Sequence, residues 1–232
     1  MEGAEFDKFA DEYRALHAAS IALSGEKPDF FAEYKVRDVA QTYGQAPERA
    51  AALAILDFGA GVGTSVPFLL KYFPNAQITC LDVSTKSLEV GRARFPNDAE
   101  FKIFDGVHIP FDDNKFDIAL AACVFHHIDH AEHAALLREF RRILAPGGFA
   151  FVFEHNPLNP LTVRVVNTCP FDENARLIRA WTMRRRFVDA GFTHVTLRYR
   201  IFFPGALRAL RPLEAWMGWL PLAAQYCVFA TK

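Results

Sequence analysis

An acid followed by three alternating glycines constrains the fold of this chain more than any other feature. The segment reads LDFGAGVGTS, covers residues 56–65, and follows an apolar run that begins at Ala50. An amphipathic stretch at 66–73 comes directly after it. This order predicts a buried strand, a tight turn and a helix, the ligand-binding corner of a doubly wound α/β sheet. Glycine suits the turn because it tolerates positive φ and lets the backbone approach a ligand.

The alternation of apolar and amphipathic segments continues along the chain. Further strands are expected at 77–83, 100–104, 116–123, through Val152 and Phe153, and at 195–203 and 225–230. Strands that alternate with helices imply a parallel sheet with right-handed crossovers. Before the first strand, aromatic residues recur at helical spacing, so residues 1–46 are expected to form a helical cap with a break near Gly25 and Pro28.

Five motifs occur in order over roughly residues 50 to 155: LDFGAGVGTS, LDVS, FDGVHIPF, FDIALAACVFHHI and RRILAPGGFAFVFE. In this order and spacing they resemble the class I S-adenosylmethionine-dependent methyltransferases. The resemblance implies a Rossmann-like doubly wound sheet of seven strands, the last antiparallel and inserted between the fifth and sixth, with helices on both faces. It implies S-adenosylmethionine as cofactor, bound by a domain at 47–232 that forms one unit with the cap.

The resemblance assigns one group of residues to the methionine and ribose part of the cofactor. Asp57 and the turn glycines Gly59, Gly61 and Gly63 would lie against it. Cys123, at the tip of the fourth strand, would face the methionyl end through its backbone atoms.

A second group is assigned to the nucleoside. Asp82 would accept the ribose hydroxyls, and Val83 would pack on the adenine. Asp105, with Gly106 beside it, would meet the exocyclic amine, and Tyr13 could close over the cofactor. Each of the three acids of the site also has a simpler explanation as a cap or turn residue, because aspartate is common at both places.

The catalytic requirement of such an enzyme is modest, because the cofactor already carries an activated methyl group. The protein must align the methyl with a nucleophile and, for an O–H or N–H acceptor, remove a proton. His155 follows the fifth strand, where the ligand crevice of a parallel sheet lies, and is the expected general base. His126 is the second candidate, and each histidine could instead have a structural role.

The histidine-rich segment 126–130, with His133, also invites a metal interpretation. Its spacing matches no helical pair at i, i+4 with a third ligand close in sequence, so no metal is expected.

Composition limits the partners and the location. The net charge of −1 gives no electrostatic case for nucleic acid, and a small-molecule acceptor is expected. The four cysteines are scattered without a Cys-x-x-Cys pair, which favours reduced thiols and a cytoplasmic location. The chain shows neither the apolar core of a secretion signal nor an apolar run long enough to cross a bilayer.

The acceptor side carries weaker signals. Residues 154–172 are rich in proline and asparagine and are expected to form a long functional loop, from which Arg164 could, with Lys35, bind an acidic acceptor. The apolar stripe at 207–220 favours a helix that covers the last strands. The alternative is a lid or membrane-surface face for a lipid- or sugar-linked acceptor, with peripheral membrane contact.

Two other functions remain open from the sequence. A nicotinamide-dependent oxidoreductase would carry Gly-x-Gly-x-x-Gly, which Thr64 and Ser65 interrupt. A non-catalytic cofactor-binding or regulatory protein is the other alternative, although such a protein need not keep the glycines and all three acids.

Overall fold

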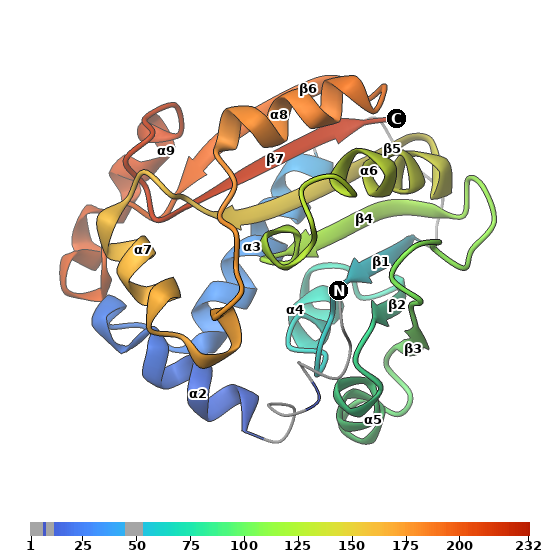
Figure 1. The fold of residues 1–232 in the computed structure, drawn as a ribbon, viewed down its shortest axis with the longest axis horizontal. Coiled ribbons are helices and arrows are strands. Elements are labelled where there is room, and N and C mark those ends of the chain that lie inside the picture. Colours follow the sequence, from blue (N-terminus) through green and yellow to red (C-terminus); the bar gives the residue numbers. More distant parts are fainter. Residues whose placement is uncertain (1–6, 8–11, 45–52) are drawn as a thin grey trace.

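The computed structural model describes residues 7, 12–44 and 53–232, without the side chains of Tyr13 and Arg14. Its centre is one seven-stranded sheet with the order β3-β2-β1-β4-β5-β7-β6 (Figure 1). The strands are β1 Ala54–Phe58, β2 Gln77–Asp82, β3 Glu100–Ile103, β4 Phe116–Ala122, β5 Leu144–His155, β6 Thr193–Arg200 and β7 Gln225–Thr231. Strands β1 to β5 pair in parallel, and β7 lies antiparallel between β5 and β6. The expected strand arrangement is confirmed.

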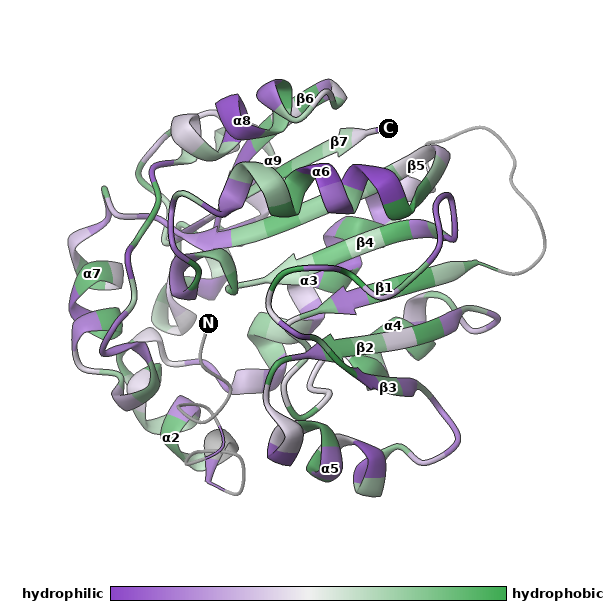
Figure 2. Cartoon of the chain, turned by 45° about the vertical axis from the view of Figure 1, so that its right-hand side comes forward, coloured by the Kyte–Doolittle hydropathy of each residue, from purple (hydrophilic) through white to green (hydrophobic). Residues whose placement is uncertain are grey.

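Helices cover both faces of the sheet, as expected. On one face lie α3 Pro28–Tyr43, α4 Val66–Tyr72 and α5 Thr85–Arg94, and on the other α6 His133–Ile143 and α8 Ala180–Asp189. The buried apolar side chains accordingly form two clusters, one on each face. Figure 2 shows hydrophobic residues running along the central strands β4, β5 and β7. A strand that is apolar on both faces fits this position, because helices exclude water from both sides.

The N-terminal segment forms helices before the first strand. Helix α2 spans Tyr13–Ser20, the short 3-10 helix η1 spans Ala22–Ser24, and α3 follows. Gly25, with φ of +70°, separates the two helical pieces, and Pro28 occupies the first turn of α3. Glycine adopts the left-handed conformation that ends a helix, and proline suits the first turn of the next one, so the predicted break is explained by these two residues. The boundary of the cap near residue 46 lies outside the described residues.

The segment 154–172 differs from the expected long loop. It contains α7 Pro160–Asn167 and the 3-10 helix η3 Pro170–Asp172. The Asn159 side chain accepts hydrogen bonds from the backbone N–H groups of Leu161 and Thr162. Asparagine at the N-cap followed by proline is a helix-start signal. The prediction of a loop relied on the proline content of the segment and did not use this signal.

The C-terminal helices also differ from expectation. The arginine-rich segment after Asp172, for which the sequence predicts a helix from Asp172 to about Ala190, forms a helix only from Ala180, as α8. Residues 205–217 form the 3-10 helix η4 Gly205–Leu213 and the short helix α9 Glu214–Met217, neither of which buries a residue.

The apolar stripe at 207–220 does not cover the last strands, so the favoured interpretation was wrong. Trp216 is 80% exposed and Trp219 is 73% exposed. Helix α8 packs on β6 and β7, and the Arg200–Asp38 ion pair joins the end of β6 to α3. No helix in the described part of the chain is long and apolar enough to cross a membrane.

Candidate active site

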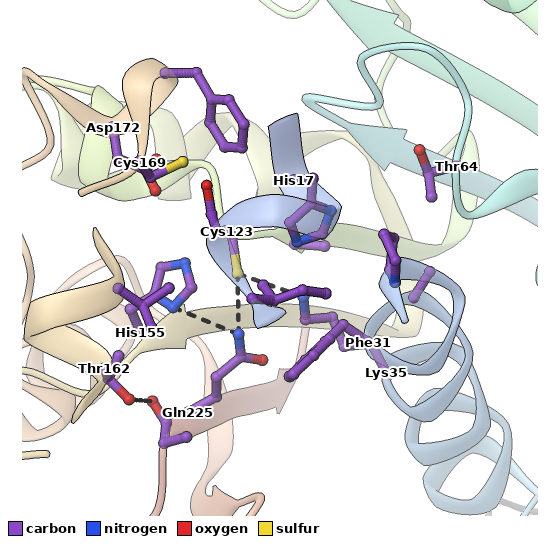
Figure 3. A pocket seen from close by; sticks show the side chains of 18 of the residues that line it. His17, Phe31, Lys35, Thr64, Cys123, His155, Thr162, Cys169, Asp172 and Gln225 are labelled. Carbon is purple, nitrogen blue, oxygen red and sulfur yellow. Dashed lines mark hydrogen bonds between the residues drawn. The ribbon is translucent and has the colours of Figure 1, made fainter. Parts of the chain in front are cut away.

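A cavity of about 460 Å³ lies at the carboxyl ends of the parallel strands. The loops after β1, β2, β4 and β5 form one side, and residues of α2, α3 and α7 form the other (Figure 3). Figures 1 and 2 show α2 and α7 side by side over this edge of the sheet. In open parallel sheets ligands bind in this position.

The cavity brings together most of the residues predicted from the sequence. Its lining includes Asp57, Gly59, Gly61, Asp82, Cys123, His126 and His155. Four predicted residues, Gly63, Val83, Asp105 and Gly106, are not among those that line it. The Tyr13 side chain lies outside the described residues.

The glycine turn leaves open space at the cavity wall. Gly59 has φ of +70°, and a Cβ there would lie 2.4 Å from a Val124 methyl carbon, so only glycine fits. Gly61 has φ of +54°, and a Cβ there would meet nothing within 4 Å. The second glycine therefore keeps a space free for a ligand that approaches the backbone.

Asp82 ties the glycine turn to the next helix. Its carboxylate accepts hydrogen bonds from the N–H of Gly61 at 2.7 Å and the N–H of Ser84 at 2.9 Å. Burial raises the pKa of Asp82, and these backbone bonds oppose that shift. Asp82 is therefore a turn residue and also a carboxylate at the cavity wall, which can accept hydrogen bonds through its remaining lone pairs.

Asp57 is a buried carboxylate whose Oδ2 has no hydrogen-bond partner among the described residues. Burial raises the pKa of Asp57 to about 7. A buried acceptor without a donor is costly, so a ligand that brings a donor would stabilise this arrangement. The orphan oxygen and the space beside Gly61 fit the polar end of an amino-acid-linked nucleoside.

Asp105 is directed at its own turn. Its Oδ1 accepts hydrogen bonds from the N–H groups of Val107 and His108, both at 2.8 Å. These bonds lower the pKa of the Asp105 carboxyl group. The simpler explanation as a turn acid describes this geometry, and the adenine contact stays a prediction.

Cys123 presents its side chain to the cavity, although only its backbone was expected there. The residue has φ of +61°, and Lys35 Nζ lies 3.4 Å from its Sγ (Figure 3). Burial raises the pKa of the thiol, but Lys35 and His155 outweigh burial and bring the pKa to about 7. Lys35, expected to bind an acidic acceptor, therefore has a partner within the protein.

His126 lines the cavity and belongs to a buried charged cluster. Its Nδ1 lies 2.6 Å from Glu154 Oε2, while Glu154 Oε1 accepts the backbone N–H groups of Val124 and Phe125. Burial lowers the pKa of His126, but the opposing effect of Glu154 and Asp172 is larger and raises the pKa to about 10. A histidine that is already protonated cannot accept a proton, so this environment disfavours His126 as a base.

His155 lies at the end of β5, and its ring centroid is 5.2 Å from that of His126. Its Nδ1 is 3.5 Å from the amide nitrogen of Gln225, and both side chains line the cavity (Figure 3). Gln225 and Asp172 were not expected as site residues. Asp172 ends the segment 154–172, and Gln225 comes from β7, 70 residues after His155.

Comparisons with known proteins agree with this fold. Residues 56–152 match the family model described as "Methyltransferase domain". The chain is 29% identical over 170 residues to the ubiquinone/menaquinone biosynthesis C-methyltransferase UbiE of Ectopseudomonas mendocina, covering 61% of this chain and 66% of that one. It is 34% identical over 105 residues to the demethylmenaquinone methyltransferase of Thermotoga maritima, covering 45% and 44%. The chain thus spans between about half and two thirds of the length of these relatives.

Solved structures share the whole fold at low sequence identity. A SAM-dependent methyltransferase of Thermotoga maritima superposes with a TM-score of 0.67 at 19% identity, covering 99% of both chains. A SAM-dependent methyltransferase of Aquifex aeolicus gives a TM-score of 0.61 at 18% identity, covering 89% of this chain and 94% of that one.

The fold defines a Rossmann-like protein with a cavity at the carboxyl edge of its sheet, beside the glycine turn. More specifically, residues 56–152 match a methyltransferase domain, and the fold is similar to that of solved SAM-dependent methyltransferases.

Proposed function

We propose that the protein transfers the methyl group of S-adenosylmethionine to a small-molecule acceptor. The observation that carries this proposal is the single cavity that runs from the glycine turn and Asp57 to His155 and Cys123. One cavity of this kind can hold a cofactor and an acceptor side by side. Alignment of two bound reactants can lower a barrier by about 7–11 kcal/mol.

The bound cofactor supplies an activated methyl group on a sulfonium sulfur. The residues of this chain hold and orient the reactants: Asp57, the Gly61 backbone and Asp82 bind the cofactor side. His155 lies on the acceptor side and would take the proton that an O–H, N–H or acidic C–H acceptor loses as the methyl transfers. Helices α2 and α7 would exclude water from the space between them.

The acceptor we infer has an aromatic or quinone-type ring with an apolar portion. The cavity walls include the apolar residues Ile21, Phe31, Val165 and Ile201. Leu23 and Leu161 line the cavity and are also 70% and 68% exposed, so the opening has an apolar edge. The names of the similar proteins, quinone C-methyltransferases, support an acceptor of this class.

The proposal is tested in two steps. Calorimetric titration with S-adenosylhomocysteine should show one binding site per chain. Transfer of a labelled methyl group from S-adenosylmethionine to a panel of phenols, hydroquinones and aromatic amines should then identify an acceptor. Binding without transfer to any of them would favour a non-catalytic cofactor-binding protein, and absence of binding would overturn the proposal altogether.

A further inference from the structure

Three side chains that could bind a metal converge where the loop after β4 meets the segment after α7. Their ligand atoms, in His126, His127 and Asp172, lie within 4.8 Å of one another. Asp172 Oδ1 is 3.5 Å from His126 Nε2 and 3.3 Å from His127 Nε2. The backbone N–H of Arg176 donates to the His126 carbonyl oxygen at 2.7 Å, which fixes the two segments against each other.

Glu154 orients the His126 ring for a ligand. Because Nδ1 bonds to Glu154 at 2.6 Å, Nε2 points toward Asp172 and His127. That Nε2 atom is buried and makes no hydrogen bond with any residue that the structure describes. A carboxylate bonded to the far nitrogen of a histidine is the usual arrangement behind a metal ligand, where it fixes the tautomer and the ring direction.

Two of the three distances between the ligand atoms fit a first-row divalent cation, and the two histidine nitrogens lie within 4.8 Å of each other. Ligands that bind Zn²⁺ at about 2.0–2.2 Å in a tetrahedron lie about 3.3–3.6 Å apart. The two distances from Asp172 Oδ1 fall at this spacing. All three residues also line the cavity, so a fourth coordination position would be open to it.

The charges of the cluster point the same way. Glu154 is fully buried and Asp172 is 8% exposed, so two carboxylates lie away from bulk water. A dication bound between the histidines and Asp172 would compensate both of these charges. Lys35 also lines the cavity, but its ammonium group is directed at Cys123 Sγ.

We propose that His126, His127 and Asp172 form a binding site for a divalent transition-metal cation such as Zn²⁺, with Glu154 as the residue that positions His126. The metal displaces one proton from His126 Nε2, which passes to solvent. Two histidines and one carboxylate with an open position are a ligand set that imidazole-preferring metals occupy in proteins. If the proposed methyl transfer holds, the open position faces the acceptor and could bind its oxygen atom.

The site is tested by metal titration of chelator-treated, full-length protein. Zn²⁺ should bind at one equivalent per chain by calorimetry, and Co²⁺ should give visible absorption bands that Zn²⁺ abolishes. Asp172→Asn and His127→Gln should each weaken Zn²⁺ binding about tenfold or more, whereas His130→Gln, an exposed histidine of the same segment, should bind like wild type. Circular dichroism establishes that each variant is folded.

Absence of Zn²⁺ and Co²⁺ binding to the wild type, or equal affinity in folded Asp172→Asn and His130→Gln, would overturn the proposal and leave His126 as a histidinium held between carboxylates. Titration of the same metal-free protein with S-adenosylhomocysteine separates this result from the proposed function. If the protein binds S-adenosylhomocysteine but no metal, the metal-site proposal is overturned and the proposed methyl transfer is not affected.

Discussion

At the scale of single residues, Asp82 and Asp105 both lie at the end of a strand in the sequence, but their carboxylates have different surroundings in the structure. Asp82 lines the cavity and joins two backbone segments, whereas Asp105 is exposed and accepts hydrogen bonds from its own turn. Both were assigned to the cofactor from position at a strand end. Their difference can be measured.

Replacing Asp82 with asparagine should weaken S-adenosylhomocysteine binding by about 1.5–3 kcal/mol, because a charged acceptor is lost. Asp105→Asn is the matched variant and should change the affinity by less if its carboxylate serves the turn. Calorimetry measures both. An Asp105→Asn loss as large as that of Asp82→Asn would restore Asp105 to the cofactor site.

The general base can be assigned by kinetics once an acceptor is known. His155→Ala should lower turnover about 10²–10⁴-fold, the usual contribution of a base, and should leave cofactor affinity nearly unchanged. Wild-type turnover in this variant would mean that the acceptor reacts by alignment alone.

Cys123 should react as a low-pKa thiol. Its alkylation rate by iodoacetamide should rise with pH through about 7, because only the thiolate attacks. Lys35→Met removes the ammonium that stabilises the thiolate, so the midpoint should move upward. A Cys123→Ala variant controls for the other cysteines. The same midpoint in Lys35→Met and wild type would contradict the assigned cause.

At the scale of elements, helices α6 and α8 are joined through one buried histidine. His133 Nε2 donates to the Ile128 carbonyl oxygen at 3.0 Å, and its Nδ1 accepts from Arg186. A neutral imidazole satisfies both contacts. Burial and the Arg186 charge lower the pKa of His133 to about 4.

This pairing predicts a loss of stability in mild acid. The unfolded chain takes up a proton at His133 below about pH 6.5, whereas the native protein does so only near pH 4. The His133 contribution is therefore complete above pH 6.5 and lost as the pH falls to about 4. Denaturant unfolding of wild type and His133→Gln should show a smaller pH dependence in the variant over this window. Parallel stability curves would exclude His133 as the cause.

At the scale of the whole molecule, exposed apolar residues gather beside the cavity opening. They are Leu207, Leu210, Leu213, Trp216, Trp219 and Leu222, with Leu158, Leu161 and Leu23 on neighbouring segments. The acid within this stretch, Glu214, accepts the backbone N–H groups of Phe202 and Phe203, whereas Arg208 is exposed. An apolar surface with an exposed cation is typical of a face that rests on an anionic bilayer.

The double variant Trp216→Ser, Trp219→Ser should therefore lose most of its co-sedimentation with anionic phospholipid vesicles. Trp181→Ser is the control, because Trp181 is 64% exposed on α8. Neutral vesicles should bind the wild type more weakly. Equal sedimentation of the double variant and the control would remove the membrane-surface interpretation.

The sequence by itself determined the fold class of this protein and the glycine turn at the edge of its sheet. Periodicity, glycines in a turn and acids at strand ends are local signals, and the seven-stranded sheet and the position of Asp57, Gly59, Gly61 and Asp82 followed from them. The N-cap residue Asn159 was also a local signal for α7, but the high proline and asparagine content of residues 154–172 favoured the prediction of a loop.

Tertiary structure alone decided the chemistry around the acceptor. Lys35 meets Cys123 across 88 residues, and Asp172 reaches the two histidines from another segment. The exposure of the 205–220 stripe likewise depended on how this segment lies against the rest of the molecule. Such contacts depend on how distant elements pack, and no pattern within one segment records where another segment will lie.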